Sequence, residues 1–421
     1  MFDELIRNLS NTSVFTESFQ AWWSGLSING IIMFIMMIFM LVGAIDKIRL
    51  TLSSAPAEVK EDENNFIYAK QFDEGFMAMG ALAVAMAGVV AAAPVLKILL
   101  EPIIAPIYKM VGASPAMFAT TLLACDMGGY PMAMQLAGAG NEAVGNFAGL
   151  ILGGMMGPTI VFTIPIALSV IKAEDKGFLG AGVLCGLITI PLGCIAGGLC
   201  MNMTQYKMPL GAILVNLIPV IIVAAAVCIG LWFATDKMIS GFNKFGNAIM
   251  VLITIVSAIA VFEYITGIKF PLFNLMVEAP EGEALCPLES GLLVCGQIAI
   301  VLIGAFPMVA WIKKTFGKAL NKVGSALGMD ETGSAGLVAT LANNVATINM
   351  LGDMNPQGKL LNIAFFVSAA FVFGDHLGFA GGVCPEMIFP MVVGKLVAGI
   401  TALILAWLLS EKLISKVTGS K

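Results

Sequence analysis

The run INGIIMFIMMIFMLVGAI (residues 28–45) carries no charged side chain, and its first charged neighbour is Asp46. A helix needs about 20 mostly apolar residues to cross the hydrocarbon core of a bilayer, so the composition of this run is that of a transmembrane helix. Ten similar runs follow, and together they predict an all-α polytopic membrane protein with about 11 transmembrane helices. They lie at residues 75–99, 115–136, 147–171, 178–201, 209–233, 245–265, 291–312, 333–351, 360–379 and 387–409.

Composition supports this class. The 421 residues are 59% hydrophobic and only 12% charged, whereas soluble domains carry about 25% charged residues. The net charge of −5 is modest and no long basic block occurs, which argues against nucleic-acid binding. Phosphate-binding loops, nucleotide fingerprints and nucleophile elbows with partners are also absent, so we expect neither an enzyme nor a cofactor.

The eight cysteines lie mostly inside apolar runs, without a CxxC pair or a second histidine, so the sequence predicts neither a disulfide framework nor a metal site. Residues 1–27 lack the basic start and cleavage site of a signal peptide. With Trp22 and Trp23, they are predicted to form an interfacial N-terminal segment.

An internal repeat divides the remaining chain. AAPVLKILLEPIIAPIYKMVGA, TTLLACDMGG and GGMMGPTIVF recur about 217 residues later as GAFPMVAWIKKTFGKALNKVGSALG, ATLANNVATI and AFVFGDHLGF. This predicts two repeat regions, residues 28–234 and 235–421, within one integrated membrane domain. Six predicted crossings separate equivalent segments whereas inverted copies need an odd number, so both inverted and parallel repeats remain open.

Asp126 lies near the centre of its predicted span, in ACDMGGYP. An ionised side chain there costs roughly 2.5 to 3.5 kcal/mol on insertion scales, and acids inside membranes are usually functional. The structural alternative is a carboxylate held by neighbouring polar side chains for helix packing. We favour a cation site, because glycine and proline next to Asp126 can expose backbone carbonyls.

Similar glycine and proline residues predict interrupted helices elsewhere. In MMGPTIVFTIP, Pro158 frees the carbonyl of Gly154, and Thr159 adds a hydroxyl that can donate and accept. A harmless proline kink is an equal alternative for Thr159. The complete set of predicted helix-break residues is Gly128, Gly129, Pro131, Gly157, Pro158, Gly374 and Gly378.

The second repeat contributes two further pairs of polar residues. Asn343 and Asn344 are predicted either to bind substrate or to join helices by hydrogen bonds. Asp375 and the only histidine, His376, are adjacent in FGDHLGFA (residues 373–380). Adjacent helical residues point about a hundred degrees apart, so the two need not pair. We predict cation binding or gating for Asp375, and for His376 either a proton role or a satisfied buried imidazole.

Several blocks together resemble the ethanolamine utilisation permease family, EutH type, from about residue 31 to 408. They are EGFMAMGALAVAM, TLLACDMGG, GGMMGPTIVF, PLGCIAGGL, ATLANN, VSAAF, GDHLGFA and MIFPMVVGKL. The resemblance implies a multi-pass protein of the bacterial inner membrane that admits ethanolamine to cells that metabolise it in a microcompartment. It assigns no binding residues.

Ethanolamine fits the residues proposed above. A primary amine with a pKa of roughly 10, like lysine, is cationic at neutral pH and needs compensation in a low dielectric. We expect Asp126 and Asp375 to supply charge, and the amides, Thr159 and broken-helix carbonyls to take the remaining hydrogen bonds. The alternatives are a cation/proton antiporter and a passive channel for small polar solutes. A homodimer is plausible.

Overall fold

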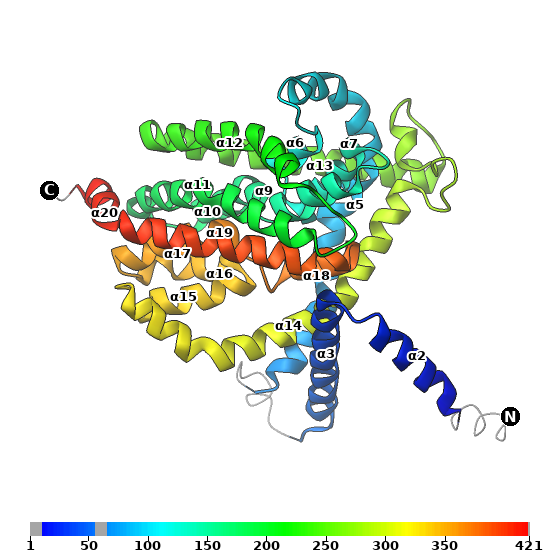
Figure 1. Ribbon diagram of the computed structural model, residues 1–421, viewed down its shortest axis with the longest axis horizontal. Helices are drawn as coiled ribbons and strands as arrows, with labels where there is room; N and C mark the ends of the chain where they lie inside the picture. Colours follow the sequence, from blue (N-terminus) through cyan, green and yellow to red (C-terminus); the bar gives the residue numbers. More distant parts are fainter. Residues whose placement is uncertain (1–10, 55–64, 420–421) are drawn as a thin grey trace.

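The computed structural model describes residues 11–54 and 65–419, and this part of the chain folds into helices without a β-strand (Figure 1). The predicted all-α class is therefore confirmed for these residues. Eight helical segments among them are long and apolar enough to cross a membrane. They are α3 (Ile28–Leu52), α5 (Ile67–Met110), the segment Glu142–Val170, the segment Ala173–Met201 with α11 (Lys176–Met201), α12 (Leu210–Phe233), α13 (Thr235–Thr266), α14 (Pro287–Ala326) and the segment Pro385–Leu408 with α19 (Ile388–Leu408).

The three remaining predicted crossings are pairs of short helices. They are α6 (Ala116–Leu122) with α7 (Gly129–Ala137), α15 (Glu331–Ala342) with α16 (Asn344–Met350), and α17 (Pro356–Ala369) with α18 (Asp375–Val383). The longest of these helices, α17, has 14 residues. At about 1.5 Å per residue it is shorter than a hydrocarbon core of about 30 Å. The total of eleven crossings therefore stays a prediction.

The core is centred on α11, which packs against α12, α17 and α19. These four helices run side by side in Figure 1, while α3 stands across their direction. Small residues let α11 and α19 approach closely: a Cβ on Gly193 would lie 2.4 Å from the carbonyl oxygen of Gly394. Close backbone approach of this kind is the usual basis of helix association in membranes, where the hydrophobic effect between helices is weak.

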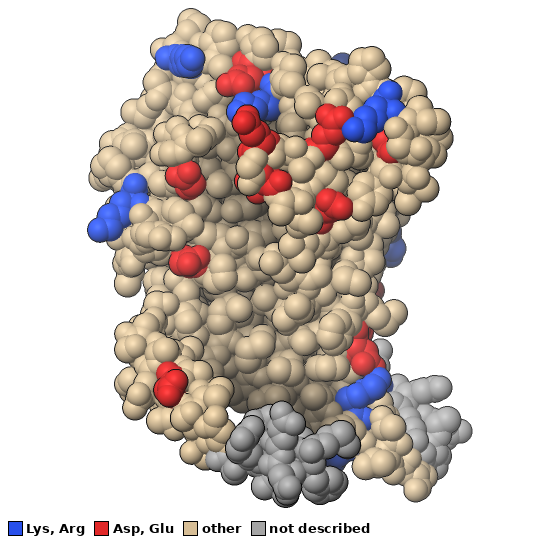
Figure 2. Space-filling model, turned by 90° about the vertical axis from the view of Figure 1, so that its right-hand side faces the viewer, with Lys and Arg blue, Asp and Glu red and all other residues tan. Residues whose placement is uncertain are grey.

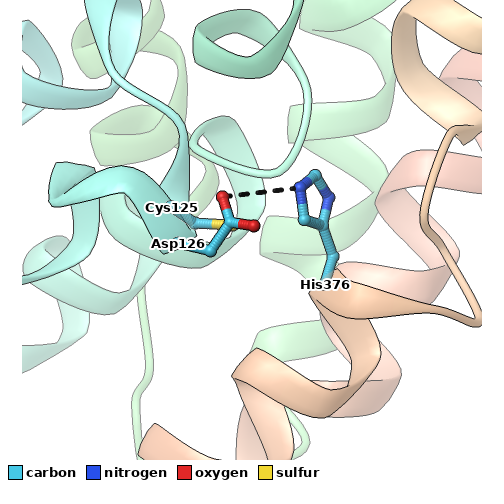
Figure 3. A group of neighbouring side chains, drawn as sticks. All are labelled: Cys125, Asp126 and His376. Carbon is cyan, nitrogen blue, oxygen red and sulfur yellow. Dashed lines mark ion pairs between the residues drawn. The ribbon is translucent and has the colours of Figure 1, made fainter. Parts of the chain in front are cut away.

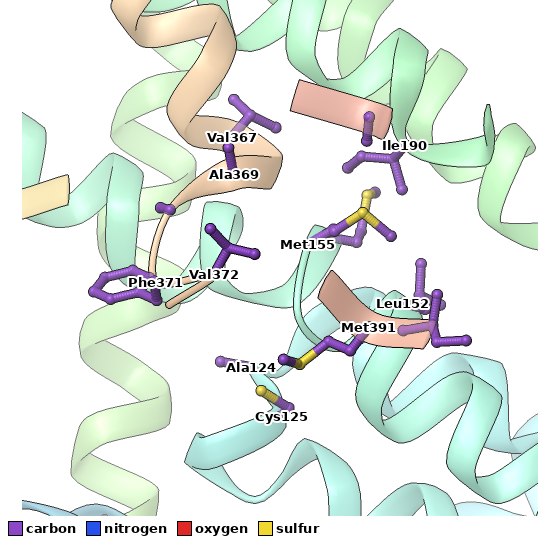
Figure 4. Close-up of a cluster of buried hydrophobic side chains, with 14 of the residues drawn as sticks. Ala124, Cys125, Leu152, Met155, Ile190, Val367, Ala369, Phe371, Val372 and Met391 are labelled. Atoms are coloured by element: carbon purple, nitrogen blue, oxygen red, sulfur yellow. The ribbon is translucent and has the colours of Figure 1, made fainter. Parts of the chain in front are cut away.

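Buried apolar side chains pack around the helix interruptions (Figure 4). Met155 and Leu152 pack with Met391 of α19 and Ile190 of α11, and all four are inaccessible to solvent. Methionine fills irregular spaces well because its side chain is unbranched and flexible. The irregular backbone near Met155 is thus enclosed by protein, the condition under which non-helical backbone is tolerated at membrane depth.

Much of the molecular surface carries no charge. On the face shown in Figure 2, Asp and Glu side chains gather toward the upper end, and a broad uncharged region lies below them. The helix α2 (Thr12–Ser24) buries none of its residues, and Figure 1 shows it projecting away from the other helices. Residues 1–10 of the predicted interfacial segment lie outside the described residues, and an interfacial location for residues 11–27 stays a prediction.

Candidate functional site

The first interruption lies between α6 and α7. Leu123 is extended, and Gly128 adopts a φ of +88°, a left-handed conformation in which glycine meets little steric cost. The intervening turn (Cys125–Met127) holds Asp126 outside a regular helix. The backbone N–H of Cys125 donates to the carbonyl of Gly153 at 2.9 Å, which joins this turn to a second interruption. Asp126 is therefore positioned by backbone contacts between two broken helices.

The second interruption, around residues 153–155, lies inside the segment Glu142–Val170. It is flanked by two π-helical stretches, Phe147–Leu152 and Thr159–Thr163. Irregular helix of this type occurs frequently at functional sites. The structure places Gly157 directly against the first interruption, where a Cβ on this residue would lie 1.9 Å from the carbonyl oxygen of Leu123. A side chain at this position would separate the two broken segments.

The second half of the chain contains a matching arrangement. Asn343 is extended between α15 and α16, and residues 370–374 separate α17 from α18. The N–H of Phe373 donates to the carbonyl of Leu341 at 2.9 Å. A Cβ on Gly374 would lie 2.1 Å from the carbonyl oxygen of Ala342. Both halves therefore bring one broken helix against the broken end of another.

Asp126, Asp375 and His376 line one cavity of about 640 Å³. The structure thus brings together three of the six predicted binding residues. Most other residues of the wall are apolar, and they come from α5, α13 and the Pro158–Ile166 region. A largely apolar cavity with a few convergent polar groups is the usual form of a small-molecule site.

The two acidic residues differ from the histidine in their exposure. Asp126 and Asp375 are partly buried, and His376 is buried. The Nε2 atom of His376 lies 3.9 Å from Oδ1 of Asp126 (Figure 3). This separation exceeds that of a normal hydrogen bond. The imidazole and the carboxylate therefore face one another without a direct hydrogen bond.

A buried lysine of α19 completes the polar cluster. Lys395 is only 1% exposed. Its Nζ lies 3.0 Å from Nδ1 of His376 and donates to the carbonyl of Gly154, the group that Pro158 was predicted to free. That carbonyl thus binds the amino group of a lysine of the protein itself, and its predicted contact with the amine of a substrate stays a prediction.

A second cavity, of about 680 Å³, adjoins the first at Asp375, which lines both. Besides Asp375, its wall includes Asn343 and three charged side chains, Glu74, Lys313 and Lys314. Asn343 therefore lies apart from the Asp126 cavity. Its side-chain oxygen accepts from the N–H of Val345 at 2.7 Å and so caps α16.

Thr159 and Asn344 are fully buried and do not belong to the wall of the Asp126 cavity. The hydroxyl of Thr159 donates to the carbonyls of Met155 and Val367, at 2.9 and 3.1 Å. The side-chain amide of Asn344 donates to the hydroxyl of Thr163 at 2.7 Å. In this structure both residues join helices from the two halves of the chain.

The predicted helix-break residues divide into two groups. Gly128, Gly129, Gly157, Pro158 and Gly374 lie at or beside the interruptions. Pro131 lies in the first turn of α7, where its missing N–H costs no helical hydrogen bond, so it does not cause the break that precedes it. Gly378 lies inside α18, where a Cβ would collide with Leu302 at 2.2 Å, so its role there is close packing.

Cys125, Asp126 and His376 could offer three ligand atoms within 4.8 Å of one another. A metal-binding histidine normally donates its second ring N–H to an acceptor such as a carboxylate or carbonyl. Here the second ring nitrogen faces the ammonium group of Lys395, which is a donor and a positive charge. We therefore do not assign these residues to a metal ion.

The sequence interpretation missed two residues of this site. The sequence could have indicated Lys395, because an isolated charge in the middle of the apolar run 387–409 is a functional candidate by default. Nothing in the sequence indicated Phe371. It adopts a φ of +62°, which is unusual for a bulky residue, and the centre of its ring lies 5.1 Å from that of His376. Such strain is maintained only where surrounding contacts determine the backbone.

Comparison with known proteins identifies the family. The model of the family described as "Ethanolamine utilisation protein, EutH" matches residues 28–409. The chain belongs to the EutH family. The resemblance inferred from the sequence blocks is therefore confirmed. With eight long apolar helices in the part that the structure describes, the chain is a multi-pass membrane protein.

Several relatives match almost the whole length of this EutH-family chain. A probable ethanolamine permease EutH of Escherichia coli is 48% identical over 92% of this chain and 97% of its own length. The protein of the same name from Listeria monocytogenes is 47% identical, with coverages of 93% and 96%. An uncharacterised Bacillus subtilis protein, YxeR, is 43% identical, with coverages of 90% and 94%. No solved structure matches the chain.

Proposed function

We propose that this EutH-family protein carries ethanolamine across the bacterial inner membrane and binds it as a protonated amine between Asp126 and Asp375. The observation that carries the proposal is the shared cavity, which is lined by one carboxylate from each half of the chain. The names of the relatives in Escherichia coli and Listeria monocytogenes, probable ethanolamine permeases, support this choice of substrate.

The charge of the cavity suits this substrate. Ethanolamine has a pKa of roughly 10 by analogy with lysine, so it is a cation at neutral pH. A cation that leaves water for a largely apolar cavity needs a nearby opposite charge. Two carboxylates and the ammonium of Lys395 carry a net charge of −1 when all three are ionised, and one bound ethanolammonium balances it.

We further propose that the two halves are structural repeats. Gly157 and Gly374 occupy equivalent positions in the repeated segments GGMMGPTIVF and AFVFGDHLGF. Each lies against the carbonyl oxygen at the broken end of a preceding helix. Transporters built from repeats commonly place broken helices around a central substrate site. The positions of Asp126 and Asp375 at two such interruptions agree with this arrangement.

Uptake of labelled ethanolamine into liposomes that contain the purified protein tests the proposal. The assay is run at mildly acidic pH, where the amine is protonated and crosses the bilayer slowly, with protein-free liposomes as the control. We expect saturable uptake that unlabelled ethanolamine inhibits. Absence of protein-dependent uptake contradicts the proposal.

The same liposomes distinguish the two alternatives. Flux that rises without saturation as ethanolamine increases indicates a channel. Sodium or proton flux that occurs without ethanolamine, and that ethanolamine does not change, indicates a cation/proton antiporter. Saturable uptake with neither behaviour supports a carrier.

A further inference from the structure

The contact between Lys395 and His376 determines which groups the imidazole can offer to a substrate. Lys395 Nζ lies 3.0 Å from Nδ1, and the carbonyl of Gly154 accepts a hydrogen from the same ammonium group. No carboxylate among the described residues lies within ion-pair distance of Lys395. Within the described part of the chain, the polar groups that contact its Nζ are a neutral carbonyl and the histidine ring.

An ammonium group has three hydrogens to donate and no lone pair to accept with. When Lys395 is ionised, Nδ1 of His376 is therefore the acceptor in this contact. A neutral imidazole carries one hydrogen on its two nitrogens, so this hydrogen lies on Nε2. A neutral lysine amine would permit the opposite arrangement, with the hydrogen on Nδ1 donating to Nζ.

On the other side of the ring, Nε2 faces Asp126, which lines the same cavity as His376 (Figure 3). Asp126 Oδ1 is 3.9 Å away, too far for a normal hydrogen bond. The N–H on Nε2 thus remains available to an acceptor inside the cavity that His376 lines. Ionised Asp126 and Asp375 can only accept hydrogens. The imidazole is therefore the donor that complements these two acceptors.

We propose that Lys395 holds His376 in the tautomer with hydrogen on Nε2, and that this N–H recognises the hydroxyl oxygen of a small amino alcohol. This inference rests on the proposed function, since it adds a hydroxyl subsite to the ammonium site of Asp126 and Asp375. Lys395 is a positioning residue that acts through His376. The cavity then distinguishes an amino alcohol from an alkylamine of similar size.

The tautomer can be measured directly because His376 is the only histidine of the chain. Protein labelled with ¹⁵N-histidine gives one pair of ring nitrogen signals, and their couplings to the ring protons show which nitrogen carries hydrogen. We expect Nε2–H in the wild-type protein and in Lys395→Arg, which keeps the charge. In Lys395→Met the signals should move toward those of a mixture of tautomers.

Wild-type protein with hydrogen on Nδ1 overturns the assignment, and so does a Lys395→Met spectrum identical to that of the wild type. Size-exclusion profiles and melting temperatures show whether each variant is folded. If both variants fail to fold, the wild-type spectrum alone still shows whether hydrogen lies on Nε2, as the proposal requires. This measurement needs no ethanolamine, so its result is separate from the success or failure of the transport assay.

Binding of ethanolamine and ethylamine to detergent-purified protein tests the hydroxyl subsite. A site built to bond a hydroxyl discriminates strongly against an analogue without one. We expect ethylamine to bind at least tenfold more weakly to the wild type, and the ratio of dissociation constants to fall toward one in Lys395→Met and His376→Phe. An unchanged ratio in folded variants refutes the subsite. Wild-type protein that binds neither amine refutes the proposed function.

Discussion

Gly157 and Gly374 make the same close contact in the two halves of the chain. A Cβ on Gly157 would lie 1.9 Å from the carbonyl oxygen of Leu123, and one on Gly374 would lie 2.1 Å from that of Ala342. Both distances are far below van der Waals contact, and in both cases the obstacle is backbone that cannot rotate away. The two helix interruptions of each half are therefore held together at a position where only glycine fits.

Replacing either glycine by alanine should destabilise the protein. Overpacking a close contact typically costs about 1–3 kcal/mol, and a backbone obstacle places these sites at the upper end of that range. We expect Gly157→Ala and Gly374→Ala each to lower the melting temperature in detergent. Gly80→Ala is the matched control, because nothing lies within 4 Å of a Cβ there. Equal melting temperatures for all three variants would contradict the close contact.

Removing the charge of either cavity carboxylate should weaken ethanolamine binding. Asp126→Asn and Asp375→Asn nearly preserve side-chain shape, so we expect both proteins to fold. Loss of one compensating charge in a low dielectric should reduce uptake at least tenfold, with Asp126→Asn abolishing it. Asp353→Asn, at an exposed position, is the control. Unchanged transport by Asp126→Asn would show that the substrate binds elsewhere.

Thr159 should contribute to stability and not to substrate affinity. Its hydroxyl donates to two backbone carbonyls, those of Met155 and Val367, and lies outside the cavity wall. Thr159→Val should therefore cost about 1 kcal/mol of stability. The dissociation constant for ethanolamine should remain within about twofold of wild type. A large rise in that constant, with little change in melting temperature, would restore the binding role expected from the sequence.

The buried ion pair between Asp175 and Lys359 should be important for folding. Lys359 Nζ lies 2.6 Å from Asp175 Oδ1, and the two side chains are only 13% and 4% exposed. Removing one partner of such a pair leaves an uncompensated charge, which costs about 3–5 kcal/mol. We expect a markedly lower melting temperature for Lys359→Met.

The exposed pair of Lys269 and Glu278 provides the comparison. Because solvent screens exposed charges, Lys269→Met should leave the melting temperature almost unchanged. The hydrogen bond from Lys269 lowers the pKa of Glu278, so loss of that lysine should raise this pKa toward its ordinary value. Equal destabilisation by Lys359→Met and Lys269→Met would show that burial does not govern these pairs.

The sequence predicted the helical class, the long spans and the two carboxylates because each depends on a strong local signal. A charge-free run of sufficient length has few structural alternatives, and an acid within such a run is costly enough to need a reason. Glycine also indicated the region of each interruption. The exact residue at which each helix breaks depended on tertiary contacts. The helix α6 ends at Leu122, well before Pro131, and the turn that follows is held by the hydrogen bond from the N–H of Cys125 to the carbonyl of Gly153.

Neighbouring residues with similar chemistry were harder to assign. Asn343 and Asn344 are adjacent amides, yet one is exposed and caps α16 while the other is fully buried against Thr163. The extended backbone at Asn343 separates their environments, and composition gives no indication of it. Lys395 was missed for a different reason. Its partners, Gly154 and His376, come from distant parts of the chain, so only the folded structure shows what offsets its burial.

Asp375 forms part of the wall of both the apolar cavity and the more polar cavity beside it. A small cation that moves from one compartment to the other can therefore keep the same anionic neighbour throughout the step. Under the proposed function, this shared carboxylate would reduce the barrier to desolvation along the path, because the cation exchanges water for protein without passing through an uncompensated position. At the boundary between the two cavities, the cation would then stay next to the carboxylate of Asp375.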